Sequence, residues 1–200
     1  MNHRPILLKE LEKRISFLLS RQITDPSDPR LGGFRTDSFH VEPRQSGFHL
    51  GEMTAAFVTP DCAWYLSPRL KDAIDLVLGY MFRHQRPDGC FDLSSCNFAS
   101  PPDTAFMMNA VLSGWWLLEN CDAPEADFMR KPICRLICTT SKGIAAGGFH
   151  TPNHRWAIAA CLLCCEKITH DAALGERARQ YLNEGLDINP DGEFAERSAG

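Results

Sequence analysis

The sequence has no apolar run that approaches the roughly 20 residues of a membrane-spanning helix, so it predicts no transmembrane segment. Basic residues are not in excess either: the formal net charge is -4, which gives no electrostatic reason to expect a nucleic-acid partner. Residues 1–14 mix charged and apolar side chains and lack the uninterrupted apolar core of a signal peptide. We therefore expect a cytoplasmic protein that contacts neither a membrane nor nucleic acid.

The nine cysteines lack the spacing of a metal site or of a disulfide framework. Their number is odd and no secretion signal accompanies them, which argues against a set of disulfides. Cys161 and Cys164 have no second pair, and no histidine, at the spacing of a zinc site. Reduced thiols that act as small core residues are the interpretation we favour, so we expect no metal and no cofactor.

Strand patterns are nearly absent, whereas helical spacing of apolar residues recurs along the chain. A chain of 200 residues with 44% hydrophobic composition can bury a core, and we treat residues 1–200 as one domain. Prolines, glycines and N-cap residues mark the ends of the helical segments. We expect helices at about residues 5–22, 49–58, 68–85, 101–119, 124–142, 152–168 and 171–184.

A short glycine–phenylalanine turn recurs between these helices. Gly-Gly-Phe or Asp-Gly-x-Phe occurs four times, with phenylalanines at 34, 91, 149 and 194, spaced 57, 58 and 45 residues apart. Each interval contains about two helices, and a period of this size is typical of stacked helical hairpins. The predicted fold is therefore all-α, built from hairpins that alternate a buried inner helix with an amphipathic outer one.

The most distinctive stretch runs from Gly147 to Trp156. A glycine pair, an N-cap threonine and a proline at the first helical position precede Asn153 and His154, which fall on the first turn of a helix. Residues 157–165 have no polar face, which predicts a helix that is buried on every side. Such a helix places an amide, an imidazole and the Arg155 guanidinium together at one end, as in the wall of a pocket.

Repeated hairpins joined by turns such as Gln85-Arg86-Pro87-Asp88-Gly89-Cys90-Phe91 resemble the (α/α) toroids of carbohydrate-active enzymes. The helix start Asn153-His154-Arg155-Trp156 and the segment Glu196-Arg197-Ser198 are most similar to the toroid domain of heparinase II/III-type and alginate-type polysaccharide lyases. Such toroids need about six hairpins to close, and this chain supplies about three and a half. The resemblance implies an incomplete toroid that lacks C-terminal repeats and any following β domain. An open arc of this kind exposes apolar inner surface and should self-associate.

The resemblance further implies a cleft for an anionic oligo- or polysaccharide that is cleaved by β-elimination. This reaction needs a neutralised carboxylate, a base for the C5 proton and an acid for the leaving oxygen. Asn153 is the candidate that hydrogen-bonds the carboxylate, and His154 is the candidate base, because the helix dipole should lower its pKa. The acid in those lyases is a tyrosine, whereas Tyr65, Tyr80 and Tyr181 here lie on predicted linkers or outer helices.

The remaining candidates lie at the starts of the predicted inner helices, which converge on one edge of a toroid. The predicted substrate-binding residues are Arg155, Arg197, Glu196, Asp103 and Trp156. Four of these five residues also have a structural interpretation: Asp103 as part of a capping box with Ser100, Glu196 and Arg197 as an ion pair, and Trp156 as a core residue. Asn153 has one too, as a residue that braces the turn, and His154 has one as a hydrogen-bonded structural histidine. His49 and Glu52 belong to the same set, with a structural role favoured.

Two other functions remain open. The first is a glycoside hydrolase that uses paired carboxylates drawn from Asp92, Asp103 and Glu196, about 5 to 9.5 Å apart across the cleft. The second is a helical-repeat scaffold, or a truncated remnant, that binds a partner without catalysis.

Overall fold

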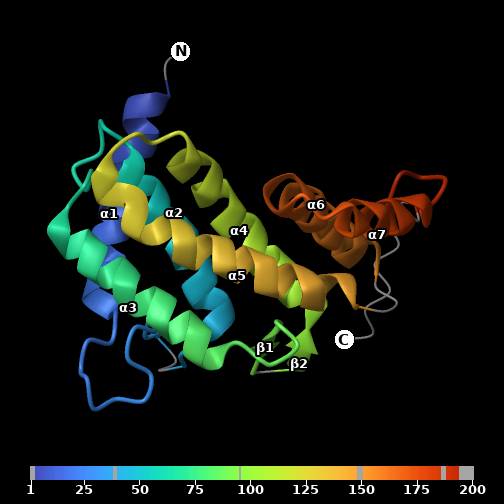
Figure 1. Ribbon diagram of the computed structural model, residues 1–200, viewed down its shortest axis with the longest axis horizontal. Helices are drawn as coiled ribbons and strands as arrows, with labels where there is room; N and C mark the ends of the chain where they lie inside the picture. Colours follow the sequence, from blue (N-terminus) through green and yellow to red (C-terminus); the bar gives the residue numbers. More distant parts are fainter. Residues whose placement is uncertain (1–2, 38–39, 95, 148–150, 186–187, 194–200) are drawn as a thin grey trace.

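The computed structural model describes residues 3–37, 40–94, 96–147, 151–185 and 188–193. Within these residues the chain is mostly helical, with seven α-helices and one two-stranded sheet (Figure 1). The helices are α1 (Arg4–Arg21), α2 (Pro43–Val58), α3 (Pro68–His84), α4 (Pro101–Glu119), α5 (Asp127–Ala145), α6 (Pro152–Thr169) and α7 (Ala172–Asn183). The strands β1 (Phe91–Leu93) and β2 (Asn97–Ser100) join α3 to α4, and a 3₁₀ turn at Pro124–Ala126 precedes α5. The expectation of an all-α chain is confirmed, apart from this small sheet.

Local capping chemistry explains where several helices begin. Ser67 and Ser100 each accept a hydrogen bond through Oγ from a backbone N–H in the first turn of α3 and α4, at 3.4 and 3.3 Å. Asp171 does the same for α7 at 3.1 Å. Each of these side chains satisfies a backbone donor that has no partner inside the helix. The predicted starts of these three helices are confirmed.

Helix α2 begins earlier than the sequence predicts, at Pro43 rather than near His49. Proline suits the first helical position because its fixed φ matches the helix and its missing N–H would have no partner there. The residue before it, Glu42, is extended and makes no side-chain capping bond. Without a capping side chain, the local sequence did not mark this start.

Helices α2, α4 and α6 pack side by side in this order and form the inner layer. Small residues bring α2 and α4 close together. A Cβ added at Gly51 would lie 2.4 Å from the carbonyl oxygen of Ala110, and one at Gly114 would lie 3.1 Å from the Thr54 Cβ. Residue numbers increase together along the contact, so the two helices run parallel.

Helices α4 and α6 are also parallel. The rings of Phe106 and His154 meet edge to face at 5.9 Å between centroids. Further along, Asn109 donates a hydrogen bond through Nδ2 to the Ala157 carbonyl oxygen at 3.1 Å. Because the three inner helices run parallel, their first turns lie along the same edge of the layer.

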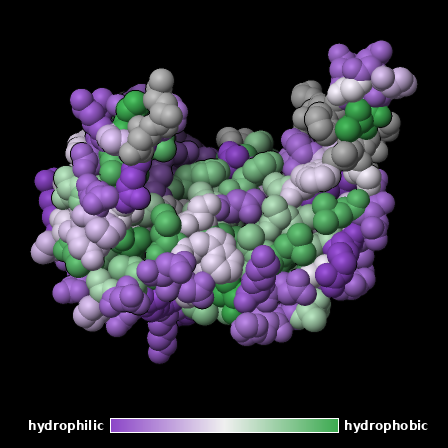
Figure 2. Space-filling view, turned by 90° about the horizontal axis from the view of Figure 1, so that it is seen from above, coloured by the Kyte–Doolittle hydropathy of each residue, from purple (hydrophilic) through white to green (hydrophobic). Residues whose placement is uncertain are grey.

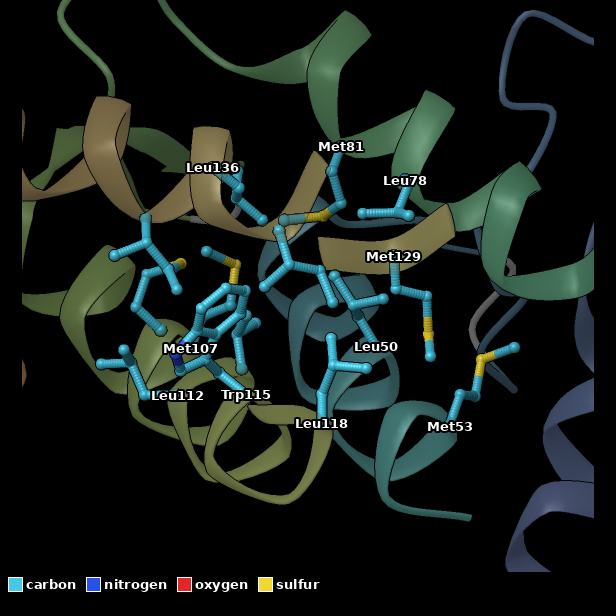
Figure 3. Close-up of a cluster of buried hydrophobic side chains, with 14 of the residues drawn as sticks. Leu50, Met53, Leu78, Met81, Met107, Leu112, Trp115, Leu118, Met129 and Leu136 are labelled. Carbon is cyan, nitrogen blue, oxygen red and sulfur yellow. The ribbon is translucent and has the colours of Figure 1, made fainter. Parts of the chain in front are cut away.

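The outer helices α3, α5 and α7 cover one side of the inner layer, and α1 packs against α2. Figure 1 shows α3 and α5 in front of α2 and α4, with α6 and α7 beyond them at one end. The core fills the space between the two layers. Figure 3 shows Leu50, Met53, Met107, Trp115 and Met129 converging there from α2, α4 and α5.

Each of the first two glycine turns is fastened to the outer helix that follows it. Gln22, after α1, donates through Nε2 to the Ala73 carbonyl oxygen of α3 at 2.9 Å. Gln85, after α3, donates through Nε2 to Thr139 Oγ1 of α5 at 2.8 Å. The two glutamines therefore occupy equivalent places in successive hairpins.

The glycines of these turns are required by geometry. Gly32 and Gly89 have φ values of 90° and 91°, in the left-handed region that favours glycine. A Cβ at Gly89 would lie 2.2 Å from the Thr139 carbonyl oxygen. The following phenylalanines, Phe34 and Phe91, are both buried. The first two predicted repeats thus correspond in structure, whereas Phe149 and Phe194 of the other two lie outside the described residues.

Helix α6 corrects the expectation that it is buried on every side. Asn153, Trp156 and Ala160 are exposed along one face of it. The molecule is hollowed between two raised ends when seen from above (Figure 2).

Within the described residues, every helix falls short of the length and apolar character needed to cross a bilayer.

Candidate functional site

Each inner helix begins with one or two prolines that are followed by a polar residue. These residues are Arg44 in α2, Asp103 in α4 and Asn153 in α6. Because the helices are parallel neighbours, the three side chains belong to the same edge of the layer. Together with His154, they are called the polar rim here.

The α2 and α4 parts of the polar rim meet in an ion pair. Arg44 Nε lies 3.4 Å from Asp103 Oδ1, and the guanidinium lies 5.7 Å from the centre of the Phe48 ring. The other carboxylate oxygen, Oδ2, accepts hydrogen bonds from Ser100 Oγ at 2.6 Å and from Asn97 Nδ2 at 3.2 Å. Asp103 therefore does take part in the predicted cap at the start of α4, while it also faces a cation.

The α6 part of the polar rim meets α4 through a ring contact. His154 packs edge to face on Phe106, one turn after Asp103. The Asn153 side-chain oxygen accepts hydrogen bonds from the His154 backbone N–H at 2.8 Å and from Thr151 Oγ1 at 2.6 Å. Thr151 is thus the N-cap by position, but its hydroxyl binds Asn153 instead of accepting a backbone N–H. The amide oxygen of Asn153 is engaged in this turn.

Arg155, which the sequence assigns to the substrate, lies elsewhere. Its side chain is only about 4% exposed, and Nη1 pairs with Glu184 Oε2 at 3.2 Å. Nη2 donates to the Gly185 carbonyl oxygen, also at 3.2 Å. These contacts fasten α6 to the end of α7, so the structure uses this arginine in packing. Trp156 is 46% exposed, which corrects the alternative that it is a core residue.

Arg44 was not identified from the sequence as a site residue. The signal that could have found it is the Pro43-Arg44 dipeptide, which matches Pro152-Asn153 and Pro102-Asp103 in its place after the turn. That match becomes visible only when the start of α2 is placed correctly. Glu196 and Arg197 lie outside the described residues.

His49 and Glu52 lie inside α2, not at its start, and form a cluster with α1. His49 is 4% exposed, with Nδ1 at 3.2 Å from Glu52 Oε2 and its ring edge-on to Phe34. Arg14 pairs with the same carboxylate at 3.2 Å. Burial raises the pKa of Glu52, but the hydrogen bond with His49 and the charge of Arg14 outweigh it and lower the pKa. The cluster joins α1 to α2.

Two of the candidates for catalysis, Asp92 and Tyr181, have structural partners. Asp92 pairs with Arg86 at 3.2 Å and accepts a hydrogen bond from the Ala99 backbone N–H at 2.7 Å, which holds the strand hairpin. Tyr181 OH donates to the Gly147 carbonyl oxygen at 2.8 Å. Burial raises the pKa of Tyr80 to about 12, and this side chain lies on outer helix α3.

A second feature, an apolar groove, lies between α1, α2 and α4. Two adjoining cavities of about 600 and 370 Å³ share Leu11, Ala55 and Leu117 in their walls. The second cavity also reaches Gly51, the small residue at the α2–α4 contact. Leu7, which is 68% exposed, lines the outer end of the first.

None of the nine cysteines, all of which the structure describes, forms a disulfide, and five of them are buried. Burial raises the pKa of the Cys90 thiol to about 11. In the part of the chain that the structure describes, no group of three or more His, Cys, Asp or Glu side chains is placed so that it could hold a metal ion.

The chain matches no protein-family model, no curated protein and no solved structure with which it was compared.

Proposed function

We propose that the polar rim binds an oligo- or polysaccharide, and that the two layers form an incomplete (α/α) toroid like those of carbohydrate-active enzymes. The observation that supports this most is the parallel packing of α2, α4 and α6, which brings the starts of three helices to one edge. The edge combines a guanidinium, a carboxylate, an amide and an imidazole. Such convergent polar groups fix the orientation of a hydroxyl-rich ligand.

Exposed aromatic side chains supply the apolar part of the proposed site. Trp156 follows the rim residues on α6, and Phe98 is 72% exposed on β2, one residue beyond Asn97, which binds Asp103. Aromatic rings provide flat apolar surface at low entropic cost, and pyranose rings present a matching apolar face. The proposed ligand therefore lies across α4 and α6 with its rings against these side chains.

We propose that this site also cleaves its ligand by β-elimination. His154 is the proposed base and Asn153 the residue that hydrogen-bonds the uronate carboxylate. The three tyrosines lie on outer helices or between α2 and α3, so the acid would come from another group or from water.

Binding and cleavage are tested separately by calorimetry and by the ultraviolet absorbance of unsaturated uronides. Oligogalacturonates, alginate oligomers and heparin oligosaccharides are the probes. Asn153→Ala and His154→Ala should weaken binding at least tenfold, whereas Lys167→Ala, exposed at the far end of α6, should leave it unchanged. Equal affinities for the three variants, or binding of no probe by the native chain, would refute the proposal.

The apolar groove favours a second candidate, a scaffold that binds a second copy of this chain. Helix α1 lines the groove with Leu7 and Leu11 and exposes Ile6 and Leu7 to solvent beside it, so one surface offers both a hollow and an apolar ridge. Sedimentation should show dimers at high concentration, and Leu7→Glu should dissociate them. A native chain that stays monomeric throughout would contradict this candidate.

A further inference from the structure

We infer that Arg44 selects carboxylated over neutral sugars, and that Asp103 competes with the ligand for its guanidinium. This inference depends on the proposed function, because it concerns the same polar rim. Of the four rim residues, Arg44 is the only permanent cation. The other arginine expected to bind the ligand, Arg155, is buried against Glu184.

The Arg44 side chain is held in place but is not fully used. It is about one-third exposed, and its guanidinium carbon lies 5.7 Å from the centre of the Phe48 ring. Its contact with Asp103 is a single approach of 3.4 Å at Nε, and this buried atom makes no hydrogen bond to any described residue. A guanidinium has five N–H donors in a planar fork, which fits a carboxylate through two parallel hydrogen bonds.

Asp103 does not depend on Arg44. Its Oδ2 atom already accepts hydrogen bonds from Ser100 and Asn97. If the guanidinium turned toward a ligand carboxylate, Asp103 would therefore keep two partners. The ion pair is thus an exchangeable contact, and a uronate could replace Asp103 in it.

The helix dipoles favour an anion at the same place. Arg44 occupies the first turn of α2, where the positive end of the dipole repels a cation. Two further helices, α4 and α6, begin along the same edge. A bound carboxylate would offset the charge of Arg44 and interact favourably with these helix starts. A neutral sugar would gain none of this.

The test compares trigalacturonate with its fully methyl-esterified form, which has the same rings but no charge. Calorimetry at low salt gives the ratio of the two affinities. In the native chain the charged ligand should bind about tenfold more tightly, as expected for charge-assisted hydrogen bonds at a partly exposed site. Arg44→Gln should abolish this preference while it leaves the affinity for the ester within about twofold.

Two further variants separate charge from structure. Asp103→Asn should increase the preference for the charged ligand severalfold, because it removes the competing carboxylate. Arg69→Gln is the matched control, since Arg69 lies on outer helix α3 with its guanidinium 6.0 Å from the Trp64 ring, and it should change neither affinity. Urea unfolding of each variant confirms that it is folded.

The outcomes distinguish the two proposals. If the native chain binds both ligands but Arg44→Gln keeps the preference, or if no preference exists, the role of Arg44 is refuted and the sugar site stands. If the native chain binds neither ligand, the proposed function fails and this inference fails with it.

Discussion

The close contact of α2 and α4 predicts that Gly51→Ala destabilises the chain, although the same substitution usually stabilises a helix. Alanine in a helix interior is favoured over glycine by about 1 kcal/mol. At position 51, however, the new Cβ would lie 2.4 Å from the Ala110 carbonyl oxygen and 2.7 Å from its carbon. These are backbone atoms, so relief requires the two helices to separate.

The magnitude follows from the size of that separation. Ordinary contact needs about 1 Å more than the available distance, and a gap of 0.5 to 1 Å forfeits about a quarter to a half of the attraction between facing atoms. Overpacking of this kind costs about 1 to 3 kcal/mol, and the helical preference of alanine offsets about 1 kcal/mol of it. We expect a net loss of up to about 2 kcal/mol in the free energy of unfolding.

Urea unfolding followed by circular dichroism measures this loss, and two other glycines provide a graded series. Gly114→Ala meets the Gly51 carbonyl oxygen at 3.0 Å and should be close to neutral. Gly79→Ala, on α3, meets only the flexible end of Arg83 at 3.3 Å and should stabilise by about 0.5 to 1 kcal/mol. If Gly51→Ala were as stable as Gly79→Ala, the parallel contact of α2 with α4 would be wrong.

Three further predictions concern titratable groups. Tyr80 should make stability fall at high pH. Its contribution to the free energy of unfolding is complete below the unfolded pKa of about 10 and is lost as the pH rises through about 12. Urea unfolding at pH 9 and 12 should therefore show a loss of roughly 2 to 3 kcal/mol in the native chain, and Tyr80→Phe should not show this loss. Glu52, whose pKa is lowered in the folded chain, should stabilise the fold above about pH 4.5 and lose this contribution as the pH falls through its folded pKa. Glu52→Gln should therefore lose less stability than the native chain between pH 6 and 3. An equal loss would contradict the stabilising role of this carboxylate. Cys96, the exposed cysteine, should react rapidly with Ellman's reagent, and Cys96→Ser should remove this fast phase, whereas the buried Cys90 thiol should react only on unfolding.

Features set by neighbouring residues were predicted well from the sequence. The N-caps at Ser67, Ser100 and Asp171 depend on hydrogen bonds within one helical turn, and all three helix starts are confirmed. The start of α2 at Pro43 has no capping side chain and was missed. The strand hairpin was also missed, because its strands of three and four residues are too short to show an alternating pattern.

The composition of the site depends on contacts between helices, which local sequence does not encode. Arg44 directly follows Pro43 and Arg155 lies three residues after Pro152, so both belong to the start of an inner helix, but neither local sequence shows what packs beside the side chain. Glu184, at the end of α7, pairs with the buried Arg155, while Arg44 has the approach to Asp103 and the contact with the Phe48 ring. Their different roles follow from which helix packs beside each of them.

Gln22 and Gln85 also affect which breaks, insertions and deletions the chain can tolerate. Each amide crosses from one hairpin to the next, since Gln22 binds α3 and Gln85 binds α5. A hairpin on its own would leave that amide and the glycine turn beside it without their partner. These amide hydrogen bonds therefore hold successive hairpins together. A break in the polypeptide between two hairpins should cost more stability than a break within a surface loop. By the same reasoning, insertion or loss of a whole hairpin preserves each glutamine hydrogen bond between neighbours, whereas the exchange of a single helix of a hairpin breaks one of them.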